Sequence, residues 1–343
     1  MTIVDLRSDT VTQPSPAMRR VMAEAEVGDD VFSEDPSVRE LEAATAELLG
    51  KPRALFVPSG TMGNQLALLT QTRPGNQVVV GHGAHIACYE AGAGAAWAGV
   101  QFAVAGQRGC FDADEFEQVL TPQSAHAPKS VLVCLENTHN HSGGRIFPER
   151  DVLAISAVAR KHGLRLHLDG ARLWHASAAT GIEAANLAAP FDSVSVCFSK
   201  GLGAPVGSAL AGDDALIREA WRFRKMLGGG MRQAGVLAAG ALFALRHQRD
   251  TLVYDHEKAK SVAAILRDGG LTVVEPDTNI VMIQLTAPAH TLVEACGEQG
   301  VLFFAMGSHL ARLVLHRDVS SSEAIRAAHV VVRCQRELSR PKS

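Results

Sequence analysis

Short apolar runs along the first part of the chain alternate with stretches in which apolar residues repeat at helical spacing. The runs that predict buried strands are residues 54–57, 78–80, 101–104, 131–135, 164–168, 193–198 and 208–211. Helical stretches, such as residues 152–161, lie between several of them. This alternation predicts an α/β fold with a mostly parallel sheet that is covered by helices on both faces.

One helix start is marked clearly. Asp35 suits the N-cap, Pro36 suits the first helical position, and apolar residues then repeat at helical spacing as far as Leu49. Gly50 favours an end there. A second helix is expected from about Gln65, after the segment Ser59–Gly60–Thr61.

The pattern changes from about residue 250. Helices are predicted at residues 256–268, 289–299 and 322–338, and strands at residues 271–274, 280–284 and 313–315. These elements indicate a smaller C-terminal α/β domain. Residues 1–30 contain prolines and an acidic segment, which is typical of an arm with one helix. We therefore expect an arm (1–30), a large domain (31–249) and a small domain (250–343).

Composition narrows the class of protein. The chain has 343 residues, of which 47% are hydrophobic, and its net charge of −3 gives no reason to expect nucleic acid as a partner. Six scattered cysteines without a CxxC pair favour reduced thiols in a cytoplasmic protein. The first residues lack the apolar core of a signal peptide, and no apolar run is long enough for a membrane span.

Two charged residues stand at the ends of predicted strands. Lys200 follows the run 193–198 and precedes a Gly/Pro-rich loop, while Asp169 follows the run 164–168. Ligands of such sheets bind at the carboxyl ends of strands. A lysine there can form a Schiff base with pyridoxal phosphate (PLP), and a carboxylate can keep the PLP ring nitrogen protonated. Taken singly, Lys200 could be a surface lysine, and Asp169 a helix cap or the ion-pair partner of Arg172.

Further residues fit the same cofactor. The segment Ser59–Gly60–Thr61 precedes a helix, so it can be a simple cap or a phosphate site. His82 and His85 could suggest a metal, but no cysteine or carboxylate accompanies them at ligand spacing. A histidine that stacks on an aromatic cofactor is the better interpretation. We therefore predict PLP and no metal.

Taken in order, several sequence blocks resemble the low-specificity L-threonine aldolases, which are PLP enzymes of fold type I, the aspartate-aminotransferase fold. The resemblance covers nearly the whole chain. The blocks are residues 5–12, 28–31, 34–36, 56–62, 136–140, 167–172, 199–207 and 224–233.

The resemblance also implies roles for individual residues. Lys200 is similar to the Schiff-base lysine, Asp169 to the acid at the ring nitrogen, and His85 to the histidine stacked on the ring. The other expected cofactor residues are Ser59, Gly60 and Thr61 at the phosphate, Arg172 at the phenolic oxygen and Lys225 at the mouth of the site. The expected substrate residues are Ser8 and Arg312 at the carboxylate, with Arg172 nearby, and His126 at the hydroxyl group.

The implied reaction is retro-aldol cleavage of L-threonine, L-allo-threonine and related β-hydroxy-α-amino acids to glycine and an aldehyde. His126 or His85 would be the base. The implied assembly is a homotetramer, a dimer of dimers with sites shared between subunits. Phe32 stands where relatives often carry tyrosine, which favours larger or aromatic β-substituents such as that of phenylserine.

Other functions stay open on the residues alone. Another PLP activity of the same fold, such as that of a β-eliminating lyase, an aminotransferase or a racemase, would also use Lys200 and Asp169. A non-catalytic binding protein on this fold is a further alternative.

Overall fold

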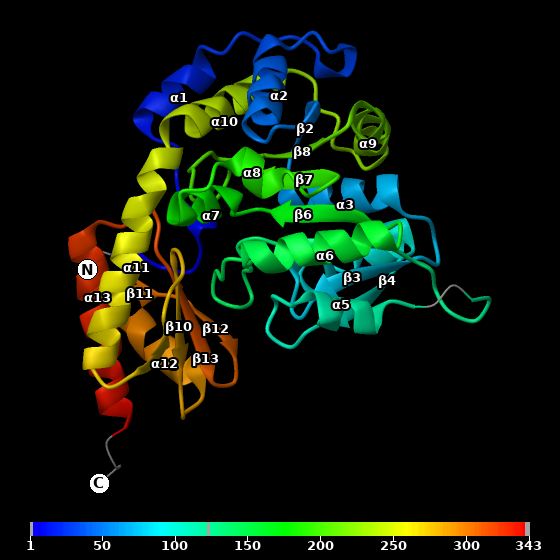
Figure 1. Cartoon of the computed structure of the whole chain (residues 1–343). Coiled ribbons are helices and arrows are strands. Elements are labelled where there is room, and N and C mark those ends of the chain that lie inside the picture. Colours follow the sequence, from blue (N-terminus) through cyan, green and yellow to red (C-terminus); the bar gives the residue numbers. More distant parts are fainter. Residues whose placement is uncertain (1–2, 122–123, 340–343) are drawn as a thin grey trace.

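The computed structural model describes residues 3–121 and 124–339, and a seven-stranded sheet lies at its centre (Figure 1). From one edge to the other, the strands are β2 (Arg53–Val57), β8 (Ser208–Gly212), β7 (Ser193–Cys197), β6 (Arg165–Gly170), β5 (Ser130–Glu136), β3 (Gln77–Gly81) and β4 (Gln101–Ala105). β8 runs antiparallel to both of its neighbours, and all other neighbouring pairs are parallel. The predicted α/β fold with a mostly parallel sheet is confirmed.

Helices cover both faces of this sheet. On one face, α3 (Gly60–Gln71) and α9 (Asp214–Met226) pack on apolar side chains of β2 and β8. On the other face, α2 (Pro36–Leu48), α6 (Glu149–Lys161) and α10 (Gly235–His247) share one core with β5, β6 and β7. Apart from the edge strand β4, the strands are therefore mostly buried, which is why they read as largely apolar runs.

The helix expected after Asp35 is confirmed. The Asp35 side chain accepts a hydrogen bond of 3.0 Å from the backbone N–H of Val38, and Pro36 occupies the first helical position. The remaining helices before residue 250 are α1 (Pro16–Ala23), α4 (His85–Cys88), α5 (Ala113–Val119), α7 (Leu173–Thr180) and α8 (Ala184–Ala188), with short helical turns at Asp9–Val11, Asp30–Phe32 and Gly94–Ala98.

A second, antiparallel sheet lies in the C-terminal part. Its strand order is β12 (Phe304–Gly307), β13 (Leu310–Val314), β10 (Ile280–Gln284) and β9 (Thr272–Val274). The helices α11 (Leu252–Asp268), α12 (Ala289–Glu298) and α13 (Ser321–Leu338) share a core with it, and a short helical turn, Arg249–Thr251, precedes α11. β12 was not predicted; its residues are mostly exposed, and its pairing with β13 defines it as a strand.

The N-terminal segment joins this C-terminal part. β1 (Val4–Asp5) pairs in parallel with β11 (Val301–Leu302), and Leu6 accepts a backbone hydrogen bond from Val314. The division into an arm (1–30), a large domain (31–249) and a small domain (250–343) stays a prediction. Residues 1–2, 122–123 and 340–343 of that division lie outside the described residues.

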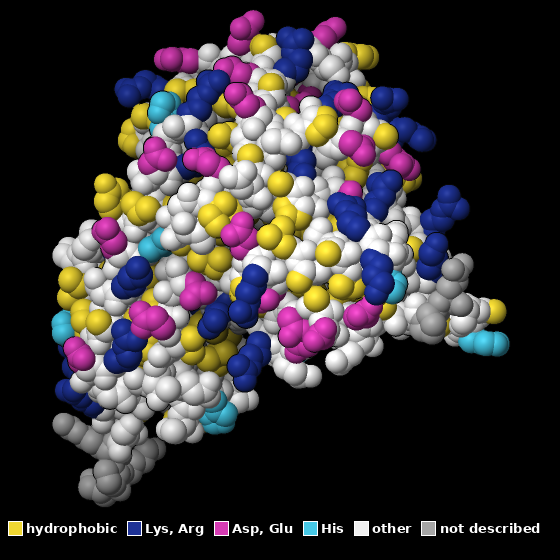
Figure 2. Space-filling view, in the orientation of Figure 1, with side chains coloured by type: hydrophobic (Ala, Val, Ile, Leu, Met, Phe, Trp, Pro, Cys, Tyr) yellow, Lys and Arg dark blue, Asp and Glu magenta, His cyan; other side chains and the backbone are white. Residues whose placement is uncertain are grey.

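The surface and the cysteines add little that is specific. Basic and acidic side chains are interspersed over the face shown in Figure 2. The six cysteines are free thiols. Within residues 3–121 and 124–339, no helix combines the length and the apolar character that a bilayer span requires.

Candidate active site

The two strand-end residues come together at the carboxyl edge of the large sheet. β6 ends with Asp169 and Gly170, and Lys200 follows the end of β7. Burial alone would raise the pKa of Asp169, but the charges of His85 and Lys200 and the hydrogen bonds from Asn64 and the Ala171 amide hold it below its usual value. Asp169 is therefore a carboxylate beside a lysine amine.

The start of α3 lies against the same edge. A Cβ atom on Gly60 would lie 2.9 Å from the Sγ atom of Cys197, the last residue of β7. The Ser59 hydroxyl accepts a hydrogen bond of 3.2 Å from the Met62 amide, which confirms its capping role. Amides in the first turn of a helix have no acceptor within the helix, so those of Gly60 and Thr61 could bind a phosphate.

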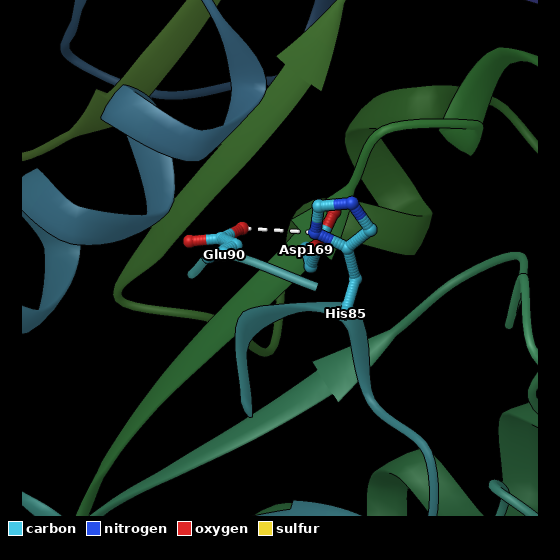
Figure 3. A group of neighbouring side chains, drawn as sticks. All are labelled: His85, Glu90 and Asp169. Carbon is cyan, nitrogen blue, oxygen red and sulfur yellow. Dashed lines mark hydrogen bonds and ion pairs between the residues drawn. The ribbon is translucent and has the colours of Figure 1, made fainter. Parts of the chain in front are cut away.

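His85, Glu90 and Asp169 form a compact group (Figure 3). The Nδ1 atom of His85 lies 2.9 Å from Glu90 Oε1, and one ligand atom of each residue lies within 4.8 Å of the others. Burial lowers the pKa of His85, but the hydrogen bond with Glu90 and the charge of Asp169 outweigh it and leave this pKa raised. Such a group could hold a metal ion.

A donor already lies between the two carboxylates of that group. The Asn64 amide donates to Glu90 Oε1 at 2.8 Å and to Asp169 Oδ2 at 2.7 Å. The Asn64 NH₂ group thus occupies the position between the two carboxylates that a metal ion would take. That no metal binds here stays a prediction.

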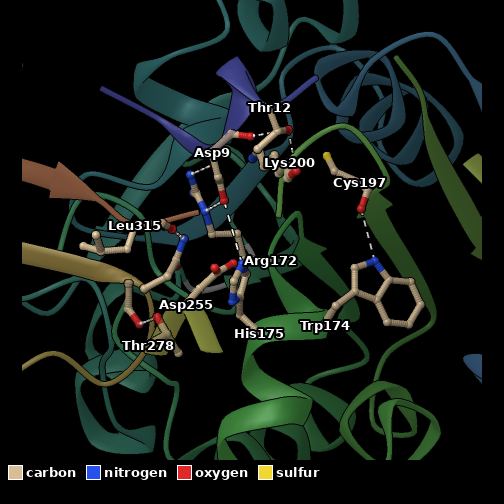
Figure 4. A network of polar contacts seen from close by, with 12 residues as sticks. Asp9, Thr12, Arg172, Trp174, His175, Cys197, Lys200, Asp255, Thr278 and Leu315 are labelled. Carbon is tan, nitrogen blue, oxygen red and sulfur yellow. Dashed lines mark hydrogen bonds and ion pairs between the residues drawn. The ribbon is translucent and has the colours of Figure 1, made fainter. Parts of the chain in front are cut away.

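Arg172 is held by the buried Asp9 (Figure 4). Its Nε and Nη2 atoms donate to the two carboxylate oxygens of Asp9 at 2.9 and 2.7 Å, and its Nη1 atom donates to Asn140 Oδ1 at 3.0 Å. Both charged side chains are almost fully buried. Burial would raise the pKa of Asp9, but the Arg172 guanidinium holds it well below its usual range. Arg172 is therefore committed to an internal ion pair.

Arg312, on β13, is also buried, with 7% of its surface exposed, but it has no such partner. It donates to Asn140 Oδ1 at 3.0 Å and to the Arg7 carbonyl at 3.3 Å, and its Nε atom has no partner. No carboxylate of residues 3–121 or 124–339 lies within ion-pair distance of it. Burial and the charge of Arg172 lower the pKa of Arg312 to about 10, so it stays a cation at neutral pH. A substrate carboxylate would complete this site.

The other expected site residues differ in position. Ser8 follows Arg7, whose carbonyl binds Arg312, and its hydroxyl accepts a hydrogen bond of 3.2 Å from the Thr10 amide. Lys225 is exposed in the last turn of α9, and the loop after it packs against α3. Their roles stay predictions.

His126 does not reach the site within this chain. It is exposed in the loop between α5 and β5, where its amide donates to the Ser124 hydroxyl. That loop lies at the edge where β5 begins, and Asp169 lies at the opposite edge, where the parallel strands end. Contact of His126 with a substrate stays a prediction, and within a single chain His126 lies too far from Asp169 to make it.

The sequence interpretation missed several polar residues of the site that are buried or partly buried. Asp9 and Asn140 lie inside blocks that carried the family resemblance, which is the signal that could have identified them. Asn64 is one of several polar residues of α3, which also contains Gln65 and Gln71, so by itself it is a weaker signal. Glu90 had no signal, because only the fold places it behind His85.

The donor set at this edge fits PLP. A lysine amine, an ionised carboxylate, a histidine ring and a helix N-terminus lie at this edge, and Arg312, whose Nε atom has no partner among the described residues, shares Asn140 with Arg172. These groups match the aldehyde, ring nitrogen, ring face and phosphate of PLP, and the carboxylate of an amino acid.

Comparisons with known proteins agree with this site. The sequence profile of the beta-eliminating lyase family matches residues 5–288. Low-specificity L-threonine aldolase 1 of Arabidopsis thaliana is 41% identical over 335 residues, covering 94% of each chain. Low specificity L-threonine aldolase of Escherichia coli (strain K12) is 40% identical over 329 residues, covering 95% of this chain and 97% of that one.

A solved structure extends the comparison to the fold. The threonine aldolase of Leishmania major superposes with a TM-score of 0.83 at 24% identity, covering 96% of this chain and 98% of that chain. At this identity the likeness concerns the fold, and it agrees with the large and small sheets described above. On the profile match and the curated relatives, the chain belongs to the beta-eliminating lyase family and, within it, to the low-specificity L-threonine aldolases.

Proposed function

We propose that this protein is a PLP-dependent L-threonine aldolase of low specificity. It would cleave L-threonine, L-allo-threonine and related L-β-hydroxy-α-amino acids to glycine and an aldehyde. The relatives' names support the reaction. The observation that carries the proposal for an amino-acid substrate is Arg312, a buried cation whose Nε atom and charge have no partner in the described chain.

The strand-end residues would hold the cofactor. Lys200 is the amine for the PLP aldehyde, Asp169 the carboxylate for the ring nitrogen, and Gly60 and Thr61 the amides for the phosphate. When bound, PLP supplies an electron sink for the bond that breaks at the substrate Cα atom. Asp169 can keep a proton on the ring nitrogen because its own pKa is low.

Arg312 would fix the substrate by its carboxylate, with Ser8 beside it. A guanidinium binds a carboxylate through two parallel hydrogen bonds, and this restricts rotation of the Cα substituents. The orientation of the carboxylate thereby determines which Cα bond can react. Cleavage of the Cα–Cβ bond then requires removal of the proton from the β-hydroxyl group.

His85 would take that proton. Glu90, as a carboxylate, accepts a hydrogen bond from His85 Nδ1, so the Nε2 atom is the nitrogen that remains free. Glu90, which orients His85, was not among the site residues expected from the sequence. His126 is the second candidate, and it would have to come from another copy of the chain.

We propose that the assembly is a homotetramer, a dimer of dimers with shared active sites, in the cytoplasm. Lys225 and His126 are both exposed in a single chain, which supports contact with neighbouring subunits. Phe32 is also exposed, at 69% of its surface, and its lack of a hydroxyl group supports acceptance of aryl substituents such as that of phenylserine.

Product analysis tests the reaction. The purified protein with PLP would be given L-threonine, L-allo-threonine and the phenylserine diastereomers, with the D-amino acids as controls. Glycine with acetaldehyde or benzaldehyde is expected. Pyruvate or another keto acid with ammonia would favour β-elimination, which the name of the family profile supports. Bound PLP without turnover would favour a binding protein.

Substitution of Lys200 tests the cofactor site. Lys200→Ala should abolish both the visible absorbance of the bound cofactor and aldehyde release, because no other amine stands at the end of β7. Lys161→Ala is the control, since Lys161 is an exposed lysine of α6 that pairs with Glu117. Turnover of Lys200→Ala near the wild-type rate would contradict the proposal.

A further inference from the structure

A chain of buried polar side chains leads from the middle of the large sheet to Asp169. His167 and Asp169 are two residues apart on β6, so their side chains share one face of the sheet. Ser193 of β7 is the direct neighbour of His167 across the strands. Asn64 and Gln71 of α3 lie two helical turns apart, and both face these strands. Nothing in the proposed function so far uses His167, Ser193 or Gln71.

Close packing brings α3 within reach of the strands. A Cβ atom on Gly63 would lie only 2.5 Å from the Ser195 hydroxyl of β7. Glycine at this position therefore allows the helix to approach the sheet at Asn64. The side chains of Asn64, His167 and Ser193 are all nearly or fully buried. Buried polar groups of this kind need hydrogen-bond partners. Here these three side chains find partners in one another, in Gln71 and in the carboxylates of Glu90 and Asp169.

The hydrogen bonds of this polar network run in one consistent direction. Gln71 Nε2 donates to the Ala67 carbonyl at 3.0 Å and to Ser193 Oγ at 2.8 Å. Reversing the Gln71 amide would place its oxygen against the Ala67 carbonyl oxygen. Ser193 Oγ accepts from Gln71 and can donate its own proton to His167 Nδ1, 2.8 Å away, which agrees with Asn64 Oδ1 facing His167 Nε2.

The histidine passes this direction on. Burial lowers the pKa of His167 to about 4, so the ring is neutral at neutral pH and carries one proton. Because Nδ1 accepts from Ser193, that proton is on Nε2, which lies 3.0 Å from Asn64 Oδ1. Asn64 must then turn its NH₂ group toward Glu90 and Asp169, where it donates at 2.8 and 2.7 Å.

We propose that His167 and Asn64 are positioning residues that orient a donor onto Asp169 and thereby keep Asp169 ionised for the PLP ring nitrogen. Without the His167 proton, the Asn64 amide could rotate and present its oxygen to two carboxylates, which would favour protonation of one of them. A polar chain in the middle of a core adds little net stability by itself. The row of polar side chains ends at Asp169, and its effect on Asp169 explains why polar residues stand in this part of the core. This inference rests on the proposed binding of PLP.

Three substitutions separate this role from simple packing. His167→Phe keeps a buried ring but removes both nitrogens, while His167→Gln retains a donor near the position of Nε2. His256→Phe is the matched control, because His256 is also buried, pairs with another histidine (His175) at 2.9 Å, and shares no hydrogen bond with His167, Ser193 or Asn64 among the described residues.

The measurements are nitrogen NMR of PLP labelled at its ring nitrogen, and the dissociation constant of PLP from the apo protein. We expect His167→Phe to lower protonation of the ring nitrogen and to weaken PLP binding about tenfold. The apparent KM for L-threonine should change little, because Arg312 is untouched. His167→Gln should restore the wild-type signal, and His256→Phe should leave it unchanged.

A folded His167→Phe protein with the wild-type nitrogen signal and a PLP dissociation constant within about twofold of wild type would overturn the inference. Failure of His167→Gln to restore the signal would do the same. If His167→Phe does not fold, Ser193→Ala replaces it. That variant should show a smaller shift in the same direction, and no shift would overturn the inference. Absence of PLP binding in the wild type would reject the proposed function as well, whereas a different product with PLP bound would leave the inference intact.

Discussion

Two buried arginines at the active site differ in whether a carboxylate of the protein neutralises them. Arg172, just after β6, donates hydrogen bonds to both carboxylate oxygens of Asp9 and to Asn140 Oδ1. Arg312, on β13 of the small sheet, shares the Asn140 oxygen but lacks a carboxylate and leaves its Nε atom unpartnered. Both side chains are less than one-tenth exposed, so the difference does not come from access to water.

The contrast indicates different tasks for the two residues. A buried charge without a counter-ion is costly, and proteins retain one where a ligand supplies the missing charge. Asp9 neutralises Arg172 within the chain, and this ion pair connects the N-terminal segment to the end of β6. Arg312 is left for a carboxylate from outside. The expected involvement of Arg172 with cofactor and substrate would therefore use only those of its N–H groups that Asp9 leaves free.

Removing the counter-ion of Arg172 should have the largest effect. Asp9→Asn makes Arg172 as unpaired as Arg312, and it should lower the free energy of unfolding by about 3–5 kcal/mol, because one buried charge remains uncompensated. Denaturant unfolding at neutral pH measures this. Asp29→Asn is the control, since Asp29 pairs with the exposed Arg232 and should contribute less than about 1 kcal/mol.

The pH dependence of the same variant checks the cause. The folded-state pKa of Asp9 lies below its value in the unfolded chain, which is about 3.9. The stabilisation is therefore fully present above that value and is lost as pH falls through the folded-state pKa. The deficit of Asp9→Asn should be largest at neutral pH and should shrink in strong acid. A deficit that does not change with pH would contradict the ion-pair explanation.

Removing the free cation should affect catalysis and leave stability nearly unchanged. Arg312→Met should lower kcat/KM for L-threonine on the order of 100-fold, through loss of the carboxylate contact. Its free energy of unfolding should stay near the wild-type value, because an unpaired buried charge is removed. Arg312→Lys should retain only part of the activity, since lysine lacks the planar fork. A wild-type kcat/KM in Arg312→Met would refute the assignment.

Giving Arg312 a partner should have a smaller effect in the same direction. Asn140→Asp places a carboxylate between the two arginines, 3.0 Å from each by the present contacts. The new charge would compete with the substrate, and the apparent KM for L-threonine should rise about tenfold. The thermal unfolding temperature should not fall. Asn140→Ser, which adds no charge, is the comparison; an equal KM in both variants would show that competition by charge is not the cause.

Much of the fold could be predicted from the sequence because its signals are local. The strands of the large sheet were readable as apolar runs, and Asp35 with Pro36 marked the start of α2. The short, mostly exposed strand β12 was not readable, since its pairing partner on β13 defines it. In the same way, Lys200 and Asp169 were found from their places after strands, while Glu90 and Asn64 gave little local signal.

By itself, the sequence determined the layered α/β arrangement and the pair of residues, Lys200 and Asp169, at the carboxyl ends of neighbouring strands. Periodicity and strand ends are properties of consecutive residues, so they can be read along the chain. Only the tertiary structure decided which arginine is neutralised, which histidine reaches the site and which way the Asn64 amide points. Those properties depend on contacts between residues far apart in sequence, such as Asp9 with Arg172 and His167 with Asn64. They exist only after the sheets have packed and excluded water.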